Sequence, residues 1–188
     1  FGMEETNSHR LNFEWARAIS ADGHWVLRFY YRGTGDSSGT FAETTVHDYL
    51  ADIAKAVSEI ERLSGTPCRG LAGLRLGADL AATFAVQKRP GLELVMWEPL
   101  VDGRKYRKSL LRTAMANEMV NSGGRHRSRS ELKRELEAGG TVSVDGFALS
   151  KPMYDSLASI DLGALGRPTS APIFLAQMLA ASAIRSRW

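Results

Sequence analysis

The chain has 188 residues, of which 44% are hydrophobic and 24% charged, and its formal net charge at pH 7 is +3. This composition argues against disorder, and no apolar run approaches the ~20 residues that a membrane-spanning helix needs. The single cysteine, Cys68, cannot form an internal disulfide, so we expect a globular domain in a reducing, cytoplasmic setting.

The basic residues gather in one segment of the chain. Residues 104–134 hold ten Lys and Arg against only Glu118 and Glu131, and the overall pI is about 9.2. Such density is typical of nucleic-acid-binding arms, but only Tyr106 is available there to stack on bases. We therefore expect a solvated surface segment and no nucleic-acid partner, and binding of nucleic acid through this segment stays an alternative.

Helical and strand patterns alternate along the chain, which is typical of a parallel sheet with flanking helices. Apolar residues at helical spacing predict amphipathic helices at 4–21 and 45–63, and an Ala-rich stretch predicts a helix at 77–88. Short runs rich in β-forming residues predict strands at 25–31, 68–74, 92–97 and 174–178, of which the second and the last are expected to be buried. The predicted fold class is α/β, with a mostly parallel sheet.

Regular periodicity weakens after the strand predicted at 92–97. Residues 101–157 contain helical stretches at 106–119 and 130–137, separated by glycine-rich turns. We therefore expect a basic helical insertion at 101–157, between a core formed by residues 1–100 and a return to the core in residues 158–188.

A strand-to-helix turn carries the most specific motif. Gly73-Leu74-Arg75-Leu76-Gly77 links a predicted strand to the Ala-rich helix, as the G-x-S-x-G nucleophile elbow does in serine hydrolases. We expect a strained backbone at the central residue, and a clash if either glycine gained a side chain. The alternative is that Gly73 and Gly77 are ordinary packing glycines and that Arg75 is a surface residue.

Arginine at the centre of this turn changes its chemistry. The guanidinium of Arg75 stays protonated and has no lone pair, so it cannot attack a carbonyl. Its charge would add to the positive end of the following helix, where the amide of Leu76 points at any bound oxyanion. The turn is therefore predicted to favour anions.

A second glycine-rich loop follows the strand predicted at 25–31. Gly33, Gly35 and Gly39 form G-x-G-x-x-x-G, one residue longer than the dinucleotide fingerprint, and the Gly-Lys-Ser/Thr of a P-loop is absent. Dinucleotide binding stays an alternative, and we expect no cofactor. Asp36 is expected to brace the turn of this loop.

Residues 29–39 resemble the F-D-Y-R-G-x-G-x-S-x-G strand and loop of α/β-hydrolases of the serine-aminopeptidase type. That loop lies about forty residues before their elbow, as Arg32 lies before Arg75. Together, residues 32–37, 73–78 and 96–103 are similar to the bacterial exosortase-A-system-associated hydrolases.

The resemblance implies an enzyme that cleaves ester, thioester or amide bonds in a small-molecule or acyl substrate. The opening Phe-Gly-Met-Glu-Glu is similar to the stretch that follows the family's oxyanion-loop strand. By resemblance, Gly2 and Met3 would therefore join Leu76 and Gly77 in binding an oxyanion. Residues 101–157 lie where this fold inserts its cap, and a basic cap would favour anionic ligands; a poorly packed insertion is the alternative.

The sequence departs from the family pattern at the catalytic triad. Arg75 holds the nucleophile position, Tyr30 stands where the family usually has aspartate, and the family's late acid and final histidine loop are absent, so we expect a truncated hydrolase fold. Asp102 lies where some hydrolases of this fold carry the acid. The four histidines lie elsewhere, at His9, His24, His47 and His126. The first three are expected to be solvated or capping residues, and a proton shuttle is the alternative for His126.

These departures oppose turnover and favour a hydrolase-family pseudoenzyme. The alternative is a non-catalytic module on the same scaffold that binds an anionic or acyl ligand. No His, Cys and Asp cluster has metal-ligand spacing, so no metal is expected. A sheet that lacks a central strand would expose apolar edges, so we expect a homo-oligomer.

Overall fold

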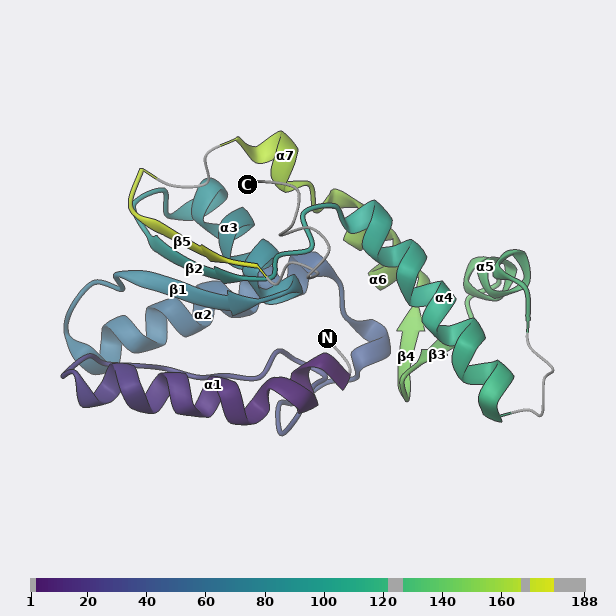
Figure 1. Cartoon of the computed structure of the whole chain (residues 1–188), viewed down its shortest axis with the longest axis horizontal. Coiled ribbons are helices and arrows are strands. Elements are labelled where there is room, and N and C mark those ends of the chain that lie inside the picture. Colours follow the sequence, from purple (N-terminus) through teal and green to yellow (C-terminus); the bar gives the residue numbers. More distant parts are fainter. Residues whose placement is uncertain (1–2, 122–126, 167–169, 178–188) are drawn as a thin grey trace, which may run out of the picture. The chain divides into compact units, whose positions relative to one another are not determined.

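The computed structural model describes residues 3–121, 127–166 and 170–177 (Figure 1). They form a mixed α/β structure, with a three-stranded parallel sheet and a separate two-stranded antiparallel hairpin. The predicted α/β class is thereby confirmed. Among the described residues, every helix is too short or too polar to cross a bilayer.

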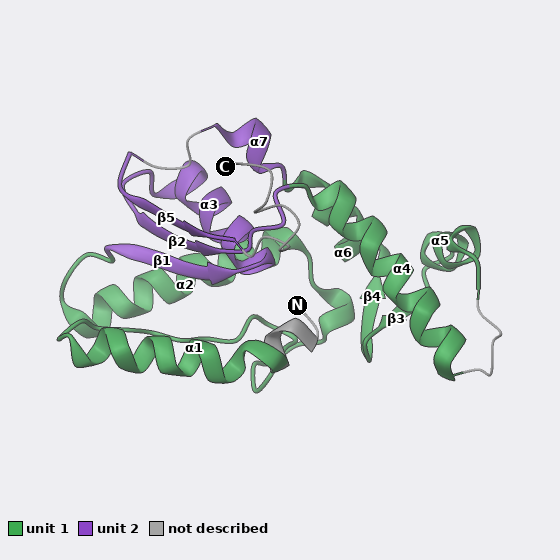
Figure 2. Ribbon diagram, in the orientation of Figure 1, with its two compact units in different colours: residues 1–68, 102–160 green, residues 69–101, 161–188 purple. Residues whose placement is uncertain are grey.

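The chain divides into two compact units, shown in different colours in Figure 2. The first unit comprises residues 1–68 and 102–160, and the second comprises residues 69–101 and 161–188. The assignment of residues 101–157 as a cap stays a prediction.

The second unit contains the parallel sheet. Its strands are β1 (Gly70–Leu74), β2 (Glu93–Trp97) and β5 (Ile173–Ala176), in the order β1-β2-β5. Helix α3 (Leu76–Lys88) connects β1 to β2 and packs on both, and the short α7 (Leu162–Leu165) contacts α3. The buried side chains of Leu80, Leu94 and Met96 belong to its core. The predicted strands at 68–74, 92–97 and 174–178 and the predicted helix at 77–88 are confirmed, except that Met178 lies outside the described residues.

Burial of the outer strands was predicted wrongly. The residues of β1 are exposed or half-buried, and Phe174 in β5 is 62% exposed. The reason is their position, because among the described residues β1 and β5 are the two edges of a three-stranded sheet and each pairs with β2 alone. In the part of the chain that the structure describes, only β2 has a neighbouring strand on both sides.

The first unit is mainly helical. Its elements are α1 (Met3–Ala21), the 3-10 turn η1 (Phe41–Glu43), α2 (Val46–Ser64), α4 (Gly103–Asn121), α5 (Arg129–Glu137), β3 (Thr141–Val144), β4 (Phe147–Ser150), α6 (Lys151–Ser156) and η2 (Leu157–Ser159). Local signals set the helix ends. Thr45 and Asp48 form a capping box at the start of α2, and Gly65, at φ 69°, ends it.

The four helices predicted for this unit are confirmed, and the predicted strand is wrong. The helices predicted at 4–21 and 45–63 correspond to α1 and α2, and those at 106–119 and 130–137 lie within α4 and α5. Residues 25–31, in contrast, form no strand, and Trp25 is 65% exposed. Their side chains have high β propensity, but propensity does not supply the neighbouring strand that a hydrogen-bonded ladder requires.

Residues 101–157 were predicted to be a helical insertion, and this is wrong in part. Within them, β3 and β4 form an antiparallel hairpin. Figure 1 shows this hairpin beside α4, which contacts β3. Its two-residue turn is Asp145-Gly146, with φ of 49° and 87°. An Asp-Gly pair between alternating apolar residues is a strong hairpin signal, and Val142 and Val144 supply that alternation.

Candidate functional site

Arg75 alone connects β1 to α3. Its backbone angles are φ 50° and ψ −120°, a conformation that glycine tolerates and other residues avoid. The N–H of Arg75 donates to the carbonyl of Trp97 at 2.8 Å, and its own carbonyl accepts from the N–H of Ala78 at 2.9 Å. The predicted strained apex is confirmed, and strain of this kind costs about 1–3 kcal/mol.

Gly73 is required by the sharpness of this turn. A Cβ at Gly73 would lie 2.4 Å from the carbonyl carbon and oxygen of Gly77, which is far closer than van der Waals contact. A Cβ at Gly77 would meet no atom within 4 Å, so the clash predicted there is wrong. The close approach is between the side-chain position of residue 73 and the backbone of residue 77, and therefore only Gly73 must lack a side chain.

Glu98 lies beside Arg75. It follows β2 directly, adopts φ 47°, and its N–H donates to the carbonyl of Ala176 at 2.7 Å. The Nη1 of Arg75 is 3.8 Å from Oε2 of Glu98, and the two side chains are 36% and 20% exposed. A cation and a carboxylate therefore meet where two neighbouring parallel strands end, which is the usual place for ligand sites in such sheets.

Asp79 is the fully buried charged residue next to this turn. Its carboxylate accepts hydrogen bonds from the N–H groups of Leu100 and Val101, both at 2.9 Å. Burial raises the pKa of Asp79 to about 6, although these two bonds and the charge of Arg75 oppose the rise. Asp79 thus ties α3 to the loop after β2, where Val101 also has a positive φ of 69°.

Sequence reasoning did not select Asp79 or Glu98. The signal for Asp79 was an acidic residue inside an apolar, Ala-rich helix, because such a residue is rarely buried without partners. Glu98 had no local signal, since its place beside Arg75 depends on the pairing of β1 with β2, which sets Leu74 opposite Trp97.

The four predicted oxyanion donors have different outcomes. Leu76 and Gly77 are the first two residues of α3, and no acceptor for their N–H groups is found among the described residues. Gly2 lies outside the described residues, and Met3 begins α1 in the other unit. A contribution from Gly2 and Met3 stays a prediction.

Asp102 caps a helix. Its Oδ1 accepts from the N–H groups of Arg104 and Lys105 at 2.9 and 3.1 Å, and Nζ of Lys105 is 3.7 Å from Oδ2. The hydrogen bond from the backbone of Lys105 is the main cause that lowers the pKa of Asp102. This carboxylate is stabilised as an anion at the start of α4, and its role as a catalytic acid stays a prediction.

The histidines show no triad geometry in the described residues. Nδ1 of His9 lies 3.1 Å from the hydroxyl of Tyr30, and the two rings stack. His126 lies outside the described residues. Nor do the described His, Cys, Asp and Glu residues form a group that could hold a metal ion.

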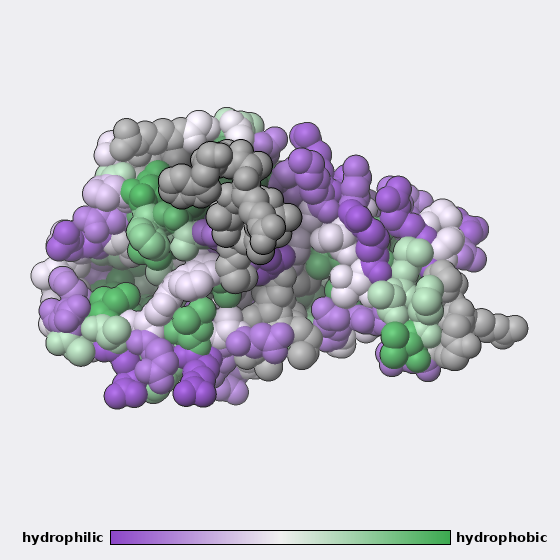
Figure 3. Space-filling model, in the orientation of Figure 1, coloured by the Kyte–Doolittle hydropathy of each residue, from purple (hydrophilic) through white to green (hydrophobic). Residues whose placement is uncertain are grey.

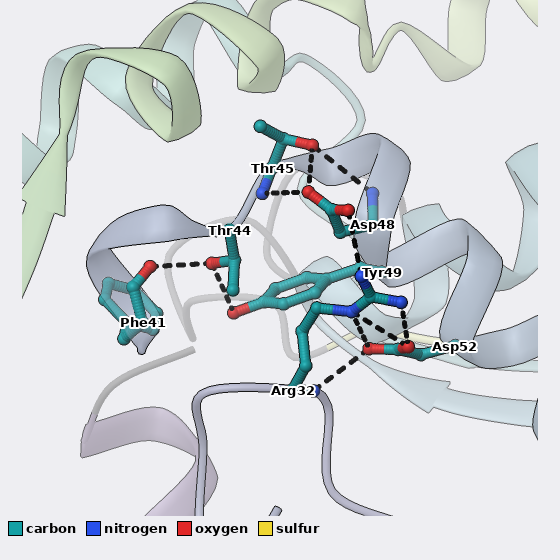
Figure 4. Close-up of polar contacts among 7 residues, drawn as sticks. All are labelled: Arg32, Phe41, Thr44, Thr45, Asp48, Tyr49 and Asp52. Carbon is teal, nitrogen blue, oxygen red and sulfur yellow. Dashed lines mark hydrogen bonds and ion pairs between the residues drawn. The ribbon is translucent and has the colours of Figure 1, made fainter. Parts of the chain in front are cut away.

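Arg32 organises the glycine-rich loop (Figure 4). Its guanidinium donates to Asp48 at 3.0 Å and to Asp52 at 2.7 Å, and its backbone N–H donates to Asp52 at 3.0 Å. Burial pulls the pKa of Asp52 upward, but the hydrogen bonds and charge of Arg32 outweigh it and lower that pKa. Arg32 therefore fixes the start of the loop to α2.

Asp36 was predicted to brace this loop, but other side chains do so. Thr34 and Ser37 donate to the carbonyls of Tyr31 and Tyr30 at 2.9 and 2.8 Å, while Asp36 is exposed. The reason is that the turn presents carbonyl acceptors, which a hydroxyl satisfies and a carboxylate does not. Because no strand precedes this loop, the structural context of a dinucleotide-binding turn is missing.

Family models and curated proteins offer no relative of this chain. The turn at Arg75 is therefore the feature of this chain that points to a function.

Proposed function

We propose that the chain is an α/β-hydrolase-type protein, of the class that acts on ester, thioester or amide bonds, in which Arg75 has replaced the nucleophile. The observation that carries this proposal is the backbone of Arg75, with φ 50° and ψ −120° between a parallel strand and a helix. A serine hydrolase needs this conformation to present its nucleophile above the sheet. An ordinary surface arginine would have no reason to adopt it.

The serine mechanism does not operate in this chain. The residue at the apex has no lone pair with which to attack a carbonyl, and its guanidinium lies beside Glu98. What the turn retains is its geometry, including the amides of Leu76 and Gly77 at the start of α3. The protein is, on this proposal, a hydrolase scaffold without serine-type turnover.

A comparison of three proteins on a panel of p-nitrophenyl esters tests the proposal. The unmodified chain should release p-nitrophenol no faster than Arg75→Ala. Arg75→Ser should release p-nitrophenol faster than Arg75→Ala but only slowly, because the turn then presents a hydroxyl to the two amides and no described histidine activates it. Arg89→Ser, at the other end of α3, controls for a serine outside the turn. Release from Arg75→Ser no faster than from Arg89→Ser would reject the hydrolase class, and turnover retained by Arg75→Ala would place any chemistry elsewhere.

The second candidate is a module that binds an anionic ligand, such as a carboxylate or phosphate. It is favoured by the amides of Leu76 and Gly77, which have no acceptor among the described residues, next to the cation of Arg75. Glu98 opposes it, because its carboxylate competes for the same guanidinium. Glu98→Gln should therefore strengthen anion binding and Arg75→Gln should weaken it.

Amide NMR shifts measured during titration with inorganic phosphate provide the test. Phosphate should move the signals of Leu76 and Gly77, with the order of affinity Glu98→Gln, then the unmodified chain, then Arg75→Gln. Unchanged amide shifts at high phosphate would dismiss this candidate.

A further inference from the structure

The structure describes nine of the ten cations of residues 104–134 and separates them into two kinds. Helix α5 carries Arg129, Lys133 and Arg134, but also three glutamates, so its net charge is zero. Arg127 donates to Glu118 at 2.5 Å and its Nη1 is 3.8 Å from Glu135. Much of the basic charge in this segment is therefore already balanced by neighbouring carboxylates.

The cations of α4 are arranged differently. Arg104, Lys105, Lys108 and Arg112 are all exposed, while Tyr106, Leu110, Leu111 and Ala114 are buried on the opposite side of the helix. Arg104, Lys108 and Arg112 follow one another at intervals of four residues, which places them in a row. We call these four residues the α4 stripe. Figure 3 shows hydrophilic side chains along α4 in this part of the surface.

The α4 stripe has little opposing charge. Residues 103–115 contain no Asp or Glu. Within the described residues, the one ion pair recorded for the stripe joins Lys105 to Asp102 at 3.7 Å, and the side chain of Lys105 is 85% exposed. The stripe therefore presents one sign of charge to solvent.

This arrangement does not favour the helix itself. Like charges four residues apart repel each other, and cations in the first turn face the positive end of the helix dipole. The capping carboxylate of Asp102 offsets part of this charge, but the first turn of α4 contains no acidic residue of its own. A bound anion would relieve both the repulsion between the cations and their unfavourable interaction with the helix dipole. A helix that only faces solvent would be more stable with alternating charges.

We propose that the α4 stripe is a docking surface for the phosphate backbone of duplex nucleic acid, bound without sequence preference. From Arg104 to Arg112 the stripe is about 12 Å long, since a helix rises about 1.5 Å per residue. A duplex carries one negative charge per about 1.7 Å of its axis, so several phosphates face a stripe of this length.

Two features of α4 favour a duplex over other polyanions. Tyr106, the aromatic residue of the helix, is 6% exposed and so does not stack on the bases of a single strand. Between Arg104 and Arg112 the apolar residues of α4 are buried, and its exposed apolar residues, Met119 and Val120, lie at the other end of the helix. The stripe itself therefore has no apolar face that could enter a membrane interface. Phosphate contacts without base contacts position a protein but do not read sequence.

Salt dependence measured by fluorescence anisotropy tests this proposal. The full chain is titrated with a labelled duplex of about 20 base pairs between about 20 and 200 mM salt. Four phosphate contacts predict a slope of log K against log salt of about −3 to −4. Lys108→Gln/Arg112→Gln should weaken binding and reduce the slope by about 2. A duplex of different sequence should bind equally well.

The matched control is Lys133→Gln/Arg134→Gln, which removes the same charge from exposed positions of α5 and should leave the slope almost unchanged. All four replaced side chains are exposed, so thermal unfolding should show that both variants stay folded. Absence of binding at the lowest salt would overturn the proposal. Equal losses in the two variants would also overturn it, because net charge alone would then be responsible. Tighter binding to phosphatidylserine vesicles than to duplex would assign the stripe to a membrane instead.

Discussion

The two glycines that flank Arg75 should respond oppositely to alanine. A Cβ at Gly73 would lie 2.4 Å from the carbonyl of Gly77 and 2.5 Å from the nitrogen of Ala78, all of which are backbone atoms. Ordinary contact begins at 3.4 Å, so the turn would have to open by about 1 Å. It is held on both sides, because the N–H of Arg75 donates to Trp97 and its carbonyl accepts from Ala78. We expect Gly73→Ala to destabilise the chain by about 2–3 kcal/mol.

Gly77→Ala is the matched control. Gly77 lies in the first turn of α3 with no atom within 4 Å of its Cβ position, so alanine fits and reduces the freedom of the unfolded chain. Its free energy of unfolding should stay equal or rise by up to about 1 kcal/mol. Urea unfolding followed by circular dichroism measures both variants. Values for Gly73→Ala and Gly77→Ala that agree within about 0.5 kcal/mol would refute the steric reasoning.

The remaining predictions concern residues outside the turn. Burial raises the pKa of Asp79 from 3.8 to about 6, so the folded chain binds this proton more tightly than the unfolded chain. The stability that Asp79 contributes is thus complete below pH 4 and is lost as the pH rises through 6, by about 3 kcal/mol in total. Urea unfolding midpoints measured from pH 4 to 7 should show this loss. The variant Asp79→Asn should not show it. Arg32→Ala should lower the stability of the chain by about 1 kcal/mol, because two half-buried aspartates lose their partner. Arg62→Ala, which breaks an exposed pair with Glu59, should have no measurable effect in the same assay, and an equal loss would contradict the role given to Arg32. Gly146→Ala should destabilise the β3–β4 hairpin, because its φ of 87° suits glycine alone, and thermal unfolding at an unchanged midpoint would argue against this turn.

The elements around the candidate site could be predicted from local sequence. The β1–α3–β2 region combines short apolar strands with an Ala-rich helix, and the spacing of Gly73, Arg75 and Gly77 indicated the turn between them. The strain at Arg75 followed from the same spacing, because a single residue must reverse the chain between a strand and a helix.

Features that depend on distant pairing were beyond the sequence. Residues 25–31 have strand-like side chains, yet whether they pair depends on a neighbouring strand elsewhere in the chain. Glu98 lies beside Arg75 because β1 pairs with β2 in a register that sets Leu74 opposite Trp97, and neither strand alone specifies that register. The hairpin differs, since Asp145-Gly146 was a local signal that an expectation of helices concealed.

The difference between two variants of Arg75 tests the elbow geometry most directly. Arg75→Ala removes the side chain and keeps the strain, whereas Arg75→Gly removes both, so side-chain effects cancel in the comparison. At an ordinary position glycine is the less stable of the two, by about 0.5–1 kcal/mol. At φ 50° and ψ −120° the order should reverse, with Arg75→Gly more stable than Arg75→Ala by about 1 kcal/mol or more in urea unfolding. If Arg75→Gly proves the less stable variant, Arg75 does not occupy the apex of a strained elbow, and the hydrolase-type assignment loses the observation that supports it.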